Sequence, residues 1–324
     1  MLSSKKKGNI LITSVGRRVE LVQEFIEKAR FLSESSKVFT TDLNPYLSAA
    51  CQVSDRSIKS PKVTDPSYPD FLLRICKDNN ITLIVPTIDT ELLVLSDIKQ
   101  VFHEVGISIV SCVTEFVLSC RDKRRTAELF KSIDITYPTI YSQETLVFPA
   151  FCKPYDGSCS IGAKLLSSAE DLTADAIQNP KNIFMEYVGS DFKEYTCDAY
   201  FDKNSILKCL VPRERLEVRA GEVSKGVTRK NYVYEFLIDR LKKFSGAVGC
   251  VTLQVFGNPD TSEIKGLEIN PRFGGGYPLT SASGCSYVEL LIREYLLDEK
   301  ISFVDDWING LIMLRYDAKV IVHE

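Results

Sequence analysis

The sequence predicts a protein of mixed α/β and α+β class, in which an open, doubly wound parallel sheet precedes a second unit that contains β-hairpins. Short apolar strands alternate with amphipathic helices from residue 9 to about 112, which is the pattern of parallel strands joined by helical crossovers. Two hairpins are expected further along, at 148–168 and 250–270. We therefore expect two domains, residues 1–112 and residues 113–324.

The elements of the first domain follow from its hydrophobic periodicity. Each expected strand is a short apolar run, and each expected helix carries apolar residues three or four positions apart. This pattern predicts strands at 10–14, 37–42, 81–87 and 107–111, and helices at 19–30, 69–80 and 91–106.

Polar residues at the strand ends of the first domain are candidates for ligand contact. A lone Gly16 stands where a dinucleotide fold would show several glycines, so a nicotinamide cofactor is not expected, although Asp42 ends the second strand where such a fold places its ribose-binding acid. Asp89 and Glu91 follow the third strand. Either they contact a substrate, or Asp89 and Thr90 cap the next helix, and the sequence leaves both interpretations open.

The second domain shows a different pattern. A basic amphipathic helix is expected at 121–133, followed by a hairpin with a long, glycine-containing tip at 148–168. Further strands are expected at 183–188, 191–201, 205–212, 250–256 and 264–270, and a helix at 230–246.

Composition and charge restrict the classes of function. Of the 324 residues, 44% are hydrophobic and 26% charged, as in soluble globular proteins. A net charge of −3, from 40 basic and 43 acidic residues, gives no electrostatic footprint for nucleic acid. No stretch approaches the roughly 20 apolar residues of a membrane span. The chain has ten cysteines without a Cys-x-x-Cys pair and only two histidines, which indicates reduced thiols rather than a zinc site. Together, these observations lead us to expect a cytoplasmic protein without nucleic-acid or membrane partners.

The segment from Glu268 to Gly276, EINPRFGGG, is the most informative part of the chain. Alternation along a strand places Glu268 and Asn270 on one face, and Gln254, which precedes Glu268 by 14 residues, faces them if the hairpin pairs without a bulge. One carboxylate and two amide oxygens suit Mg²⁺ that also binds phosphate, and Mn²⁺ is an alternative. Arg272 is a candidate phosphate clamp. The segment therefore indicates nucleotide chemistry.

Two further segments are candidates for nucleotide contact. Lys153 precedes a Gly/Ser-rich tip whose backbone N–H groups can point at phosphates, a flap that includes Gly157, Ser158, Ser160 and Gly162. The strand at Glu186, Tyr187 and Val188 offers backbone groups to a purine, and Glu194 offers an acceptor to ribose hydroxyls.

These pieces, in this order, resemble the ATP-grasp superfamily, and most of all one half of the carbamoyl-phosphate synthase large chain. The resemblance is carried over residues 121–276 by Asp122–Lys123, by CKPYDGSCSIG at 152–162, by MEYVGSDFKEYTCD at 185–198, and by the spacing of Gln254, Glu268 and Asn270. It implies that Lys123 and Lys153 hold phosphates, that Glu186, Val188 and Glu194 hold adenosine, and that residues of about 125–188 form a mobile lid. It also implies that residues 9–112 are the domain that precedes ATP-grasp domains.

The sequence departs from carbamoyl-phosphate synthase in two respects. That enzyme carries two such halves in one chain, and this chain has room for one, so the full carbamoyl-phosphate reaction is not expected. The segment 211–228, expected as a basic loop between strands, contains four cations, which indicates an anionic substrate or phosphoryl group. We expect Arg219 and Lys225 to be catalytic contacts, because each lies by a glycine, and Arg213 to contact the cofactor.

The reaction that the resemblance implies is ATP-dependent ligation of a carboxylate to an amine, or less readily a thiol, through an acylphosphate. Arg272 and Arg219 would stabilise charge on the transferred group. One alternative is a kinase that releases an acylphosphate, and another is an ATP-binding module without turnover. A homodimer is an open possibility, since dimers are common among relatives. The acid and the amine are left open by the sequence.

Overall fold

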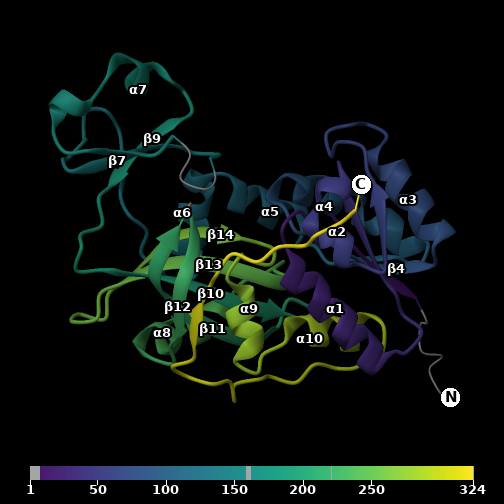
Figure 1. Cartoon of the computed structure of the whole chain (residues 1–324). Coiled ribbons are helices and arrows are strands. Elements are labelled where there is room, and N and C mark those ends of the chain that lie inside the picture. The colour runs from purple at the N-terminus through teal and green to yellow at the C-terminus, as the bar shows by residue number, and fades with distance from the viewer. Residues whose placement is uncertain (1–7, 158–161, 220, 324) are drawn as a thin grey trace.

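The N-terminal domain is an all-parallel sheet covered on both faces by helices. The computed structural model describes residues 8–157, 162–219 and 221–323. The domain lies at the right of Figure 1. Its five strands lie in the order β3-β2-β1-β4-β5, and all their pairings are parallel, which is the pairing that the sequence predicted. They are β1 (Asn9–Ile12), β2 (Val38–Asp42), β3 (Arg56–Lys59), β4 (Ile81–Val85) and β5 (Ser108–Ile109).

Alternation along β1 explains how both faces of this sheet become covered. Ile10 and Ile12 pack in one cluster with α1 (Val19–Leu32) and α2 (Ala49–Val53). Leu11 points to the opposite face, into a cluster with α3 (Tyr68–Asp78), while α4 (Asp89–Glu104) contributes to both clusters. The chain reverses direction across the sheet between β1 and β4, which is where open parallel sheets bind ligands.

Three short elements of this domain were not predicted. Strand β3 carries little apolar signal because it is an edge strand whose residues are mostly exposed. Helix α2 and the 3-10 turn η1 (Pro45–Leu47) are too short for a helical period to be visible in the sequence. Strand β5 covers only two of the five residues expected at 107–111.

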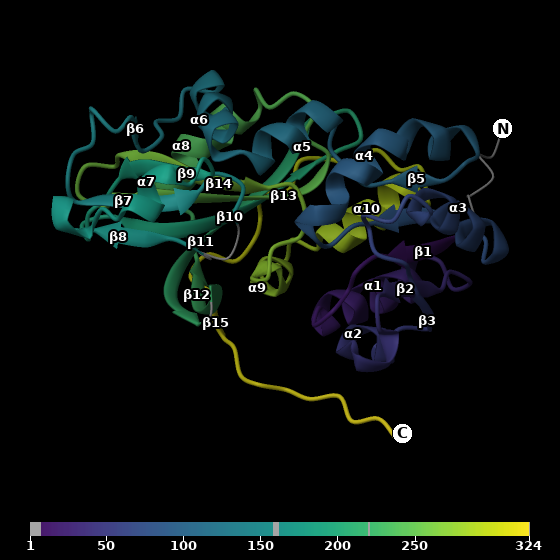
Figure 2. The same cartoon turned by 90° about the horizontal axis from the view of Figure 1, so that it is seen from above.

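The second part of the chain is built on an antiparallel sheet of six strands, in the order β14-β13-β10-β11-β12-β15. The strands are β10 (Lys193–Phe201), β11 (Leu207–Arg219), β12 (Glu222–Thr228), β13 (Gly249–Gly257), β14 (Ile264–Asn270) and β15 (Ile312–Leu314). Figure 2 shows this sheet between the N-terminal domain and a smaller lobe. The expectation of a basic loop at 211–228 was wrong, because β11 and β12 pair into a hairpin that includes most of these residues.

Helices surround the large sheet. The helix expected at 121–133 is α6 (Lys123–Ser132), which begins where the Asp122 carboxylate accepts a hydrogen bond from Arg124 N at 2.9 Å. Helix α5 (Thr114–Arg121), directly before it, was not predicted. Helix α8 (Tyr232–Leu241) lies within the predicted 230–246. Helices α9 (Tyr277–Ala282) and α10 (Tyr287–Tyr295) were not predicted. Within the described residues, no helix is long and apolar enough to cross a membrane.

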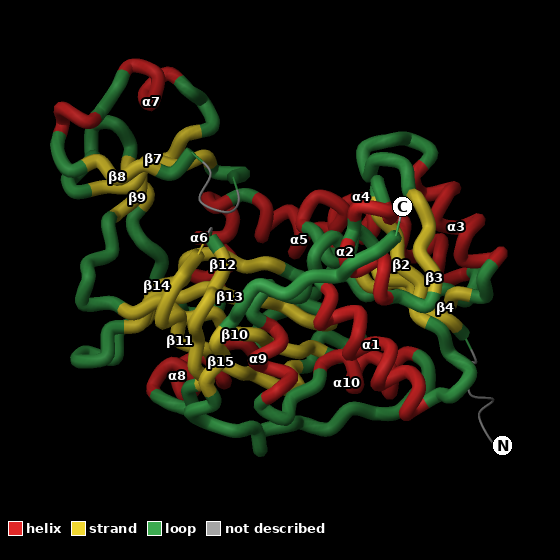
Figure 3. The backbone as a smooth tube through the Cα atoms, in the orientation of Figure 1, coloured by secondary structure: helices red, strands yellow, loops and turns green. Residues whose placement is uncertain are grey.

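The smaller lobe is a four-stranded sheet that projects from the body of the molecule (Figures 1 and 3). Its order is β6-β9-β7-β8, with β6 (Ile140–Tyr141), β7 (Ala150–Pro154), β8 (Lys164–Leu166) and β9 (Asn182–Glu186), and it carries α7 (Ala174–Gln178). Residues Cys152, Leu166, Ala176 and Phe184 form its small core. The lobe's sheet therefore begins at Ile140, while α6, which falls inside the predicted lid, packs on β14 of the large sheet.

One carboxylate fastens the N-terminal domain to the turn after β14. Glu24 on α1 accepts hydrogen bonds from the hydroxyls of Tyr277, Ser281 and Ser286 at 3.1, 2.6 and 2.6 Å. Burial raises the pKa of Glu24, and the three hydroxyls oppose that rise. This contact fixes α9, and with it the glycine run before α9, against α1.

We expect Glu24→Ala to lower the free energy of unfolding by about 2–4 kcal/mol, because three partly buried hydroxyls lose their acceptor. Urea denaturation measures the change. Glu27→Ala is the matched control, since Glu27 lies on the same helix with its side chain 75% exposed. Equal midpoints for the two variants would contradict the fastening role.

Candidate active site

Three oxygen-bearing side chains meet on adjacent strands. Gln254 on β13 is paired with Glu268 on β14, and Asn270 Nδ2 donates to Glu268 Oε1 at 2.9 Å. The pairing shifts register only beyond Gln254, so the pair expected from a regular hairpin does form. Gln254 Oε1 accepts from Arg215 Nη1 at 3.3 Å, which orients its amide.

The donor chemistry of this group fits a hard cation that is shared with phosphate. Among the described residues, no group of three or more His, Cys, Asp and Glu side chains is placed so that it could hold a metal ion. The group of Gln254, Glu268 and Asn270 supplies one charge and neutral amide oxygens, and such a set suits Mg²⁺ when phosphate oxygens and water complete the coordination.

Two lysines face this group from the lobe side. Lys123 begins α6, and its Nζ donates to Gly157 O at 2.5 Å. Burial and the nearby Lys123 ammonium lower the pKa of Lys153 to about 8, while Glu268 opposes the shift. Burial likewise lowers the pKa of Lys123 against the opposing effect of Glu268. Two cations held close together beside one carboxylate favour an anionic ligand.

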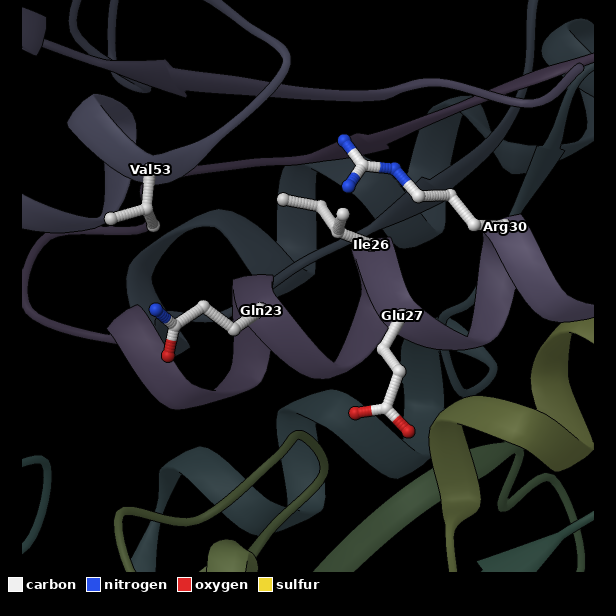
Figure 4. A pocket seen from close by; sticks show the side chains of 5 residues that line it. All are labelled: Gln23, Ile26, Glu27, Arg30 and Val53. Carbon is white, nitrogen blue, oxygen red and sulfur yellow. The ribbon is translucent and has the colours of Figure 1, made fainter. Parts of the chain in front are cut away.

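Both domains contribute to the cleft beside this group. Its walls come from α4, α5, the start of α6, the flap base and β14, and the residues are Asp89, Leu92, Val117, Cys120, Arg121, Lys123, Asp156, Gly157, Glu268, Ile269, Asn270 and Pro271. A second, open hollow lies over α1 and is lined by Gln23, Ile26, Glu27, Arg30 and Val53 (Figure 4). None of the predicted site residues lines that hollow, so the cleft is the candidate site.

Arg272 links the two domains at this cleft. Its Nη2 donates to Asp89 Oδ2 at 2.6 Å and lies 3.4 Å from Asn270 Oδ1. Asp89 therefore faces the site. Glu91 is instead buried and accepts from the backbone N–H groups of Thr87 and Ile88 at 2.8 and 3.3 Å, so it caps α4. The position of Asp89 is therefore compatible with substrate contact, whereas the cap of α4 comes from Glu91 rather than from Asp89 and Thr90.

The four cations expected to meet an anion at 211–228 lie in different surroundings. Arg215 reaches the cleft group, since its Nη1 donates to Glu194 Oε1 at 2.6 Å as well as to Gln254. Arg219 pairs instead with exposed Asp317, and Lys225 pairs with Glu217 at 2.7 Å. Both lie in the outer half of the β11–β12 hairpin, with side chains 63% and 50% exposed. The structure does not bring Arg219 and Lys225 to the metal group.

Arg213 lies beneath the glycine run rather than at the surface of the cleft. Its side chain is 2% exposed and pairs with Asp198 at 2.8 Å. A Cβ at Gly276 would come within 2.0 Å of Arg213 Nη1, so the glycine lets the turn pack directly against the arginine. Arg213 therefore packs against the glycine run, and it is not among the residues that line the cleft.

The residues expected around adenosine lie where the lobe joins the large sheet. Glu186 ends β9, accepts from Thr139 N at 3.0 Å and from Lys265 Nζ at 2.5 Å, and so ties the lobe to β14. Strand β9 ends at Glu186, two residues earlier than predicted, so Tyr187 and Val188 lie just beyond its end. Burial raises the pKa of Glu194, and Arg215 opposes the rise. Gly157 and Gly162 border the flap, whereas Ser158 and Ser160 lie outside the described residues.

Unpartnered N–H groups also mark the site. Within the described parts of the chain, buried guanidinium nitrogens without a hydrogen-bond partner include Nε and Nη1 of Arg213, Nε of Arg215 and Nε of Arg272. Unsatisfied buried donors are costly, and an anion in the cleft is one way to satisfy those that border it.

The sequence interpretation passed over some residues of the site. Arg18 donates to Phe273 O at 3.0 Å and so reaches the glycine run from the N-terminal domain. Its position just beyond the carboxyl end of the first strand was a usable signal. Arg215 is one of the four cations at 211–228, but the sequence prediction preferred Arg219 and Lys225, because each lies by a glycine. The strand register separates Arg215 from Arg219, because the pairing of β11 with β10 ends at Glu214 and Tyr195, which places Arg215 beside Glu194 and leaves Arg219 beyond the paired residues.

Comparison with known families identifies both parts of the chain. Residues 120–276 match the family described as ATP-grasp domain, and residues 10–110 match the family described as PylC-like, N-terminal domain. A search of curated proteins finds no significant match.

Solved structures share the fold across nearly the whole chain. N5-carboxyaminoimidazole synthetase from Staphylococcus aureus, complexed with ADP, is 16% identical with a TM-score of 0.74, over 96% of this chain and 82% of that one. The biotin carboxylase domain of 2-oxoglutarate carboxylase from Hydrogenobacter thermophilus, a dimer with MgADP and bicarbonate, is 15% identical with a TM-score of 0.72, over 93% and 72%. L-amino acid ligase from Bacillus licheniformis is 13% identical with a TM-score of 0.68, over 90% and 75%.

Proposed function

This chain contains an ATP-grasp domain at residues 120–276 behind a PylC-like N-terminal domain at residues 10–110, and we propose that it is an ATP-dependent carboxylate–amine ligase. The observation that carries the proposal is the meeting of Gln254, Glu268 and Asn270 with two lysines whose pKa values are lowered. Structures of similar fold include a synthetase and a ligase, and two of the similar structures contain ADP.

The reaction has two displacement steps. An oxygen of the acid attacks the γ-phosphorus of ATP, the bond to the β–γ bridging oxygen breaks, and ADP leaves. The amine nitrogen then attacks the acyl carbon, the carbon–oxygen bond to phosphate breaks, and the nitrogen loses a proton as the amide forms. The protein contributes positioning and charge stabilisation, with no covalent nucleophile required.

Each group of the cleft has a part in this scheme. Lys123 and Lys153 bind phosphate oxygens, and Arg272 stabilises charge on the transferred phosphoryl group. Gln254, Glu268 and Asn270 would hold Mg²⁺, or Mn²⁺ in its place, which neutralises phosphate charge when bound. Glu186, Tyr187 and Val188 border the adenine, and Glu194 the ribose. We propose that the lobe closes over ATP as a lid and excludes water from the acylphosphate.

The partners and the location belong to the same proposal. The substrates are a small carboxylic acid and an amine, the protein acts in the cytoplasm, and a homodimer is its proposed assembly. The biotin carboxylase domain named above is described as a dimer, which supports that assembly.

The test is ADP release across a matrix of carboxylic acids and amines, with mass spectrometry of the products. A ligase forms an amide only when both an acid and an amine are present. A kinase of the acid would release ADP with the acid alone and give a hydroxamate with hydroxylamine. ATP binding without ADP release on any acid would revive the non-catalytic alternative.

Proton uptake on ATP binding should report Lys153. With a pKa of about 8, this lysine is largely neutral at pH 9 without ligand, and phosphate favours its ammonium form. ATP binding should therefore take up close to one proton at pH 9 and few protons at pH 7. The affinity for ATP should fall as the pH rises above 8. Calorimetry in buffers of different ionisation enthalpy measures this uptake.

Lys153→Met should abolish the extra uptake at pH 9. Lys242→Met serves as the control, because Lys242 pairs with Asp239 on the exposed face of α8, away from the cleft. An unchanged uptake in Lys153→Met would show that the proton goes elsewhere.

A further inference from the structure

The edge of the cleft opposite the lobe lies at the reversal point of the N-terminal sheet. The carboxyl ends of β1 and β4 lead there to Arg18 and Asp89. Both residues touch the segment after β14, since Arg18 Nη1 donates to Phe273 O at 3.0 Å and Asp89 pairs with Arg272 at 2.6 Å. The acid substrate must approach the transferred phosphoryl group through this region, because ATP occupies the lobe side in the proposed function.

Three arginines at this edge, Arg17, Arg272 and Arg315, are paired with carboxylates. Glu222 on β12 lies 3.7 Å from Arg17 and 3.0 Å from Arg315, and Asp89 pairs with Arg272. Within the described residues, no carboxylate forms an ion pair with Arg18, although Asp89 and Glu222 are near enough to affect it. Burial, together with the charge of Arg272, lowers the pKa of Arg18 to about 10, and the two carboxylates oppose that shift.

The contacts of Arg18 leave part of its guanidinium available. Its hydrogen bond to Phe273 O is made through Nη1, and the residue is only partly buried. Arg272 next to it has a buried Nε without a partner in the described chain. Two neighbouring guanidinium groups of which one lacks a counter-ion form a site for an anion, since each can bind a carboxylate or phosphate through two N–H groups.

We infer that the acid substrate carries two anionic groups, with its reactive carboxylate at Arg272 beside the metal group and its second carboxylate or phosphate at Arg18. This inference rests on the proposed function and adds the substrate class. Asp89 holds Arg272 in place, so that the reactive carboxylate meets one fixed guanidinium. Arg18 takes the second anion on the side of the N-terminal domain, outside the ATP-binding part of the cleft.

Matched acids test the inference. Succinate is compared with succinamate, in which an amide replaces the second carboxylate, and with 3-phosphonopropionate, in which a phosphonate replaces it. Glutarate and its monoamide extend the comparison to a longer chain. Binding is measured by calorimetry with Mg²⁺ and the non-hydrolysable analogue AMP-PNP present, and kcat/KM is measured from ADP release. The comparison of succinate with 3-phosphonopropionate shows whether the second anionic group is a carboxylate or a phosphate.

The wild type should bind one of the dianionic acids about 10- to 100-fold more tightly than its monoamide, as expected for hydrogen bonds to a charged group. Arg18→Gln should remove this preference while leaving the affinity for AMP-PNP and for the monoamides within about threefold. Arg18→Lys should restore part of it. Arg30→Gln is the control, because Arg30 lies on α1 and pairs with Asp55 far from the glycine run.

Equal affinity of the wild type for the acids and their monoamides, including no binding of either, would overturn the inference. So would an equal loss for both kinds of acid in Arg18→Gln, because that result indicates a structural role. If the proposed function is wrong, no acid will stimulate ADP release. The binding comparison will still show whether the site prefers an acid with two anionic groups.

Discussion

Glu268→Gln is expected to lower ATP turnover by at least about 10²- to 10³-fold while the protein stays folded. Glu268 is the one charge in the proposed metal group, so the isosteric amide removes the charge that a cation requires. The amide oxygen can still accept from Asn270 Nδ2, whose contact with Glu268 is 2.9 Å, and the β13–β14 hairpin should be undisturbed. ADP release at saturating Mg²⁺ and ATP measures the loss, and circular dichroism checks the fold.

Two comparisons make this result specific. Asn270→Ala should show a similar loss, because it removes both a proposed metal ligand and the donor that orients Glu268. Glu128→Gln should retain wild-type turnover, since Glu128 is an exposed residue of α6. ADP release at the wild-type rate from Glu268→Gln and Asn270→Ala would refute the metal assignment.

Arg215→Met is expected to lower kcat/KM for ATP by about 10²-fold or more. Arg215 is the cation that contacts both Glu194 and Gln254, at 2.6 and 3.3 Å. Its removal would leave the Glu194 carboxylate without a counter-ion in a setting where burial already raises the pKa of that group. The loss would therefore affect both the ribose border and the orientation of the metal group.

Arg219→Met is the matched control on the same strand. Arg219 pairs with exposed Asp317, so its removal should change kcat/KM by less than about threefold.

The substitution Arg215→Met also disturbs the partly buried ion pair with Glu194. The double variant Arg215→Met/Glu194→Gln should therefore regain stability without regaining turnover. The reverse order of effects, a large loss in Arg219→Met and none in Arg215→Met, would favour the original sequence prediction.

Regular periodicity made much of the fold predictable. The parallel sheet and its helices followed from apolar runs alternating with helical spacing, and the pairing of Gln254 with Glu268 followed from strand parity. The prediction failed where the hydrophobic pattern was weak, or where a strand contained residues that are typical of a loop. The exposed edge strand β3 has no buried face, and the long strand β11 continues into charged residues that resemble a loop.

The sequence by itself determined the chemistry of the metal group, because its ligands lie on two strands joined by one turn and alternation fixes their common face. Tertiary structure alone decided which cations join that group. Arg215 and Arg219 are alike in sequence, yet one reaches Gln254 across β10 while the other extends to solvent. Arg18 and Asp89 come to Phe273 and Arg272 across more than 180 residues. Such contacts depend on how two sheets pack, and no local periodicity encodes that arrangement.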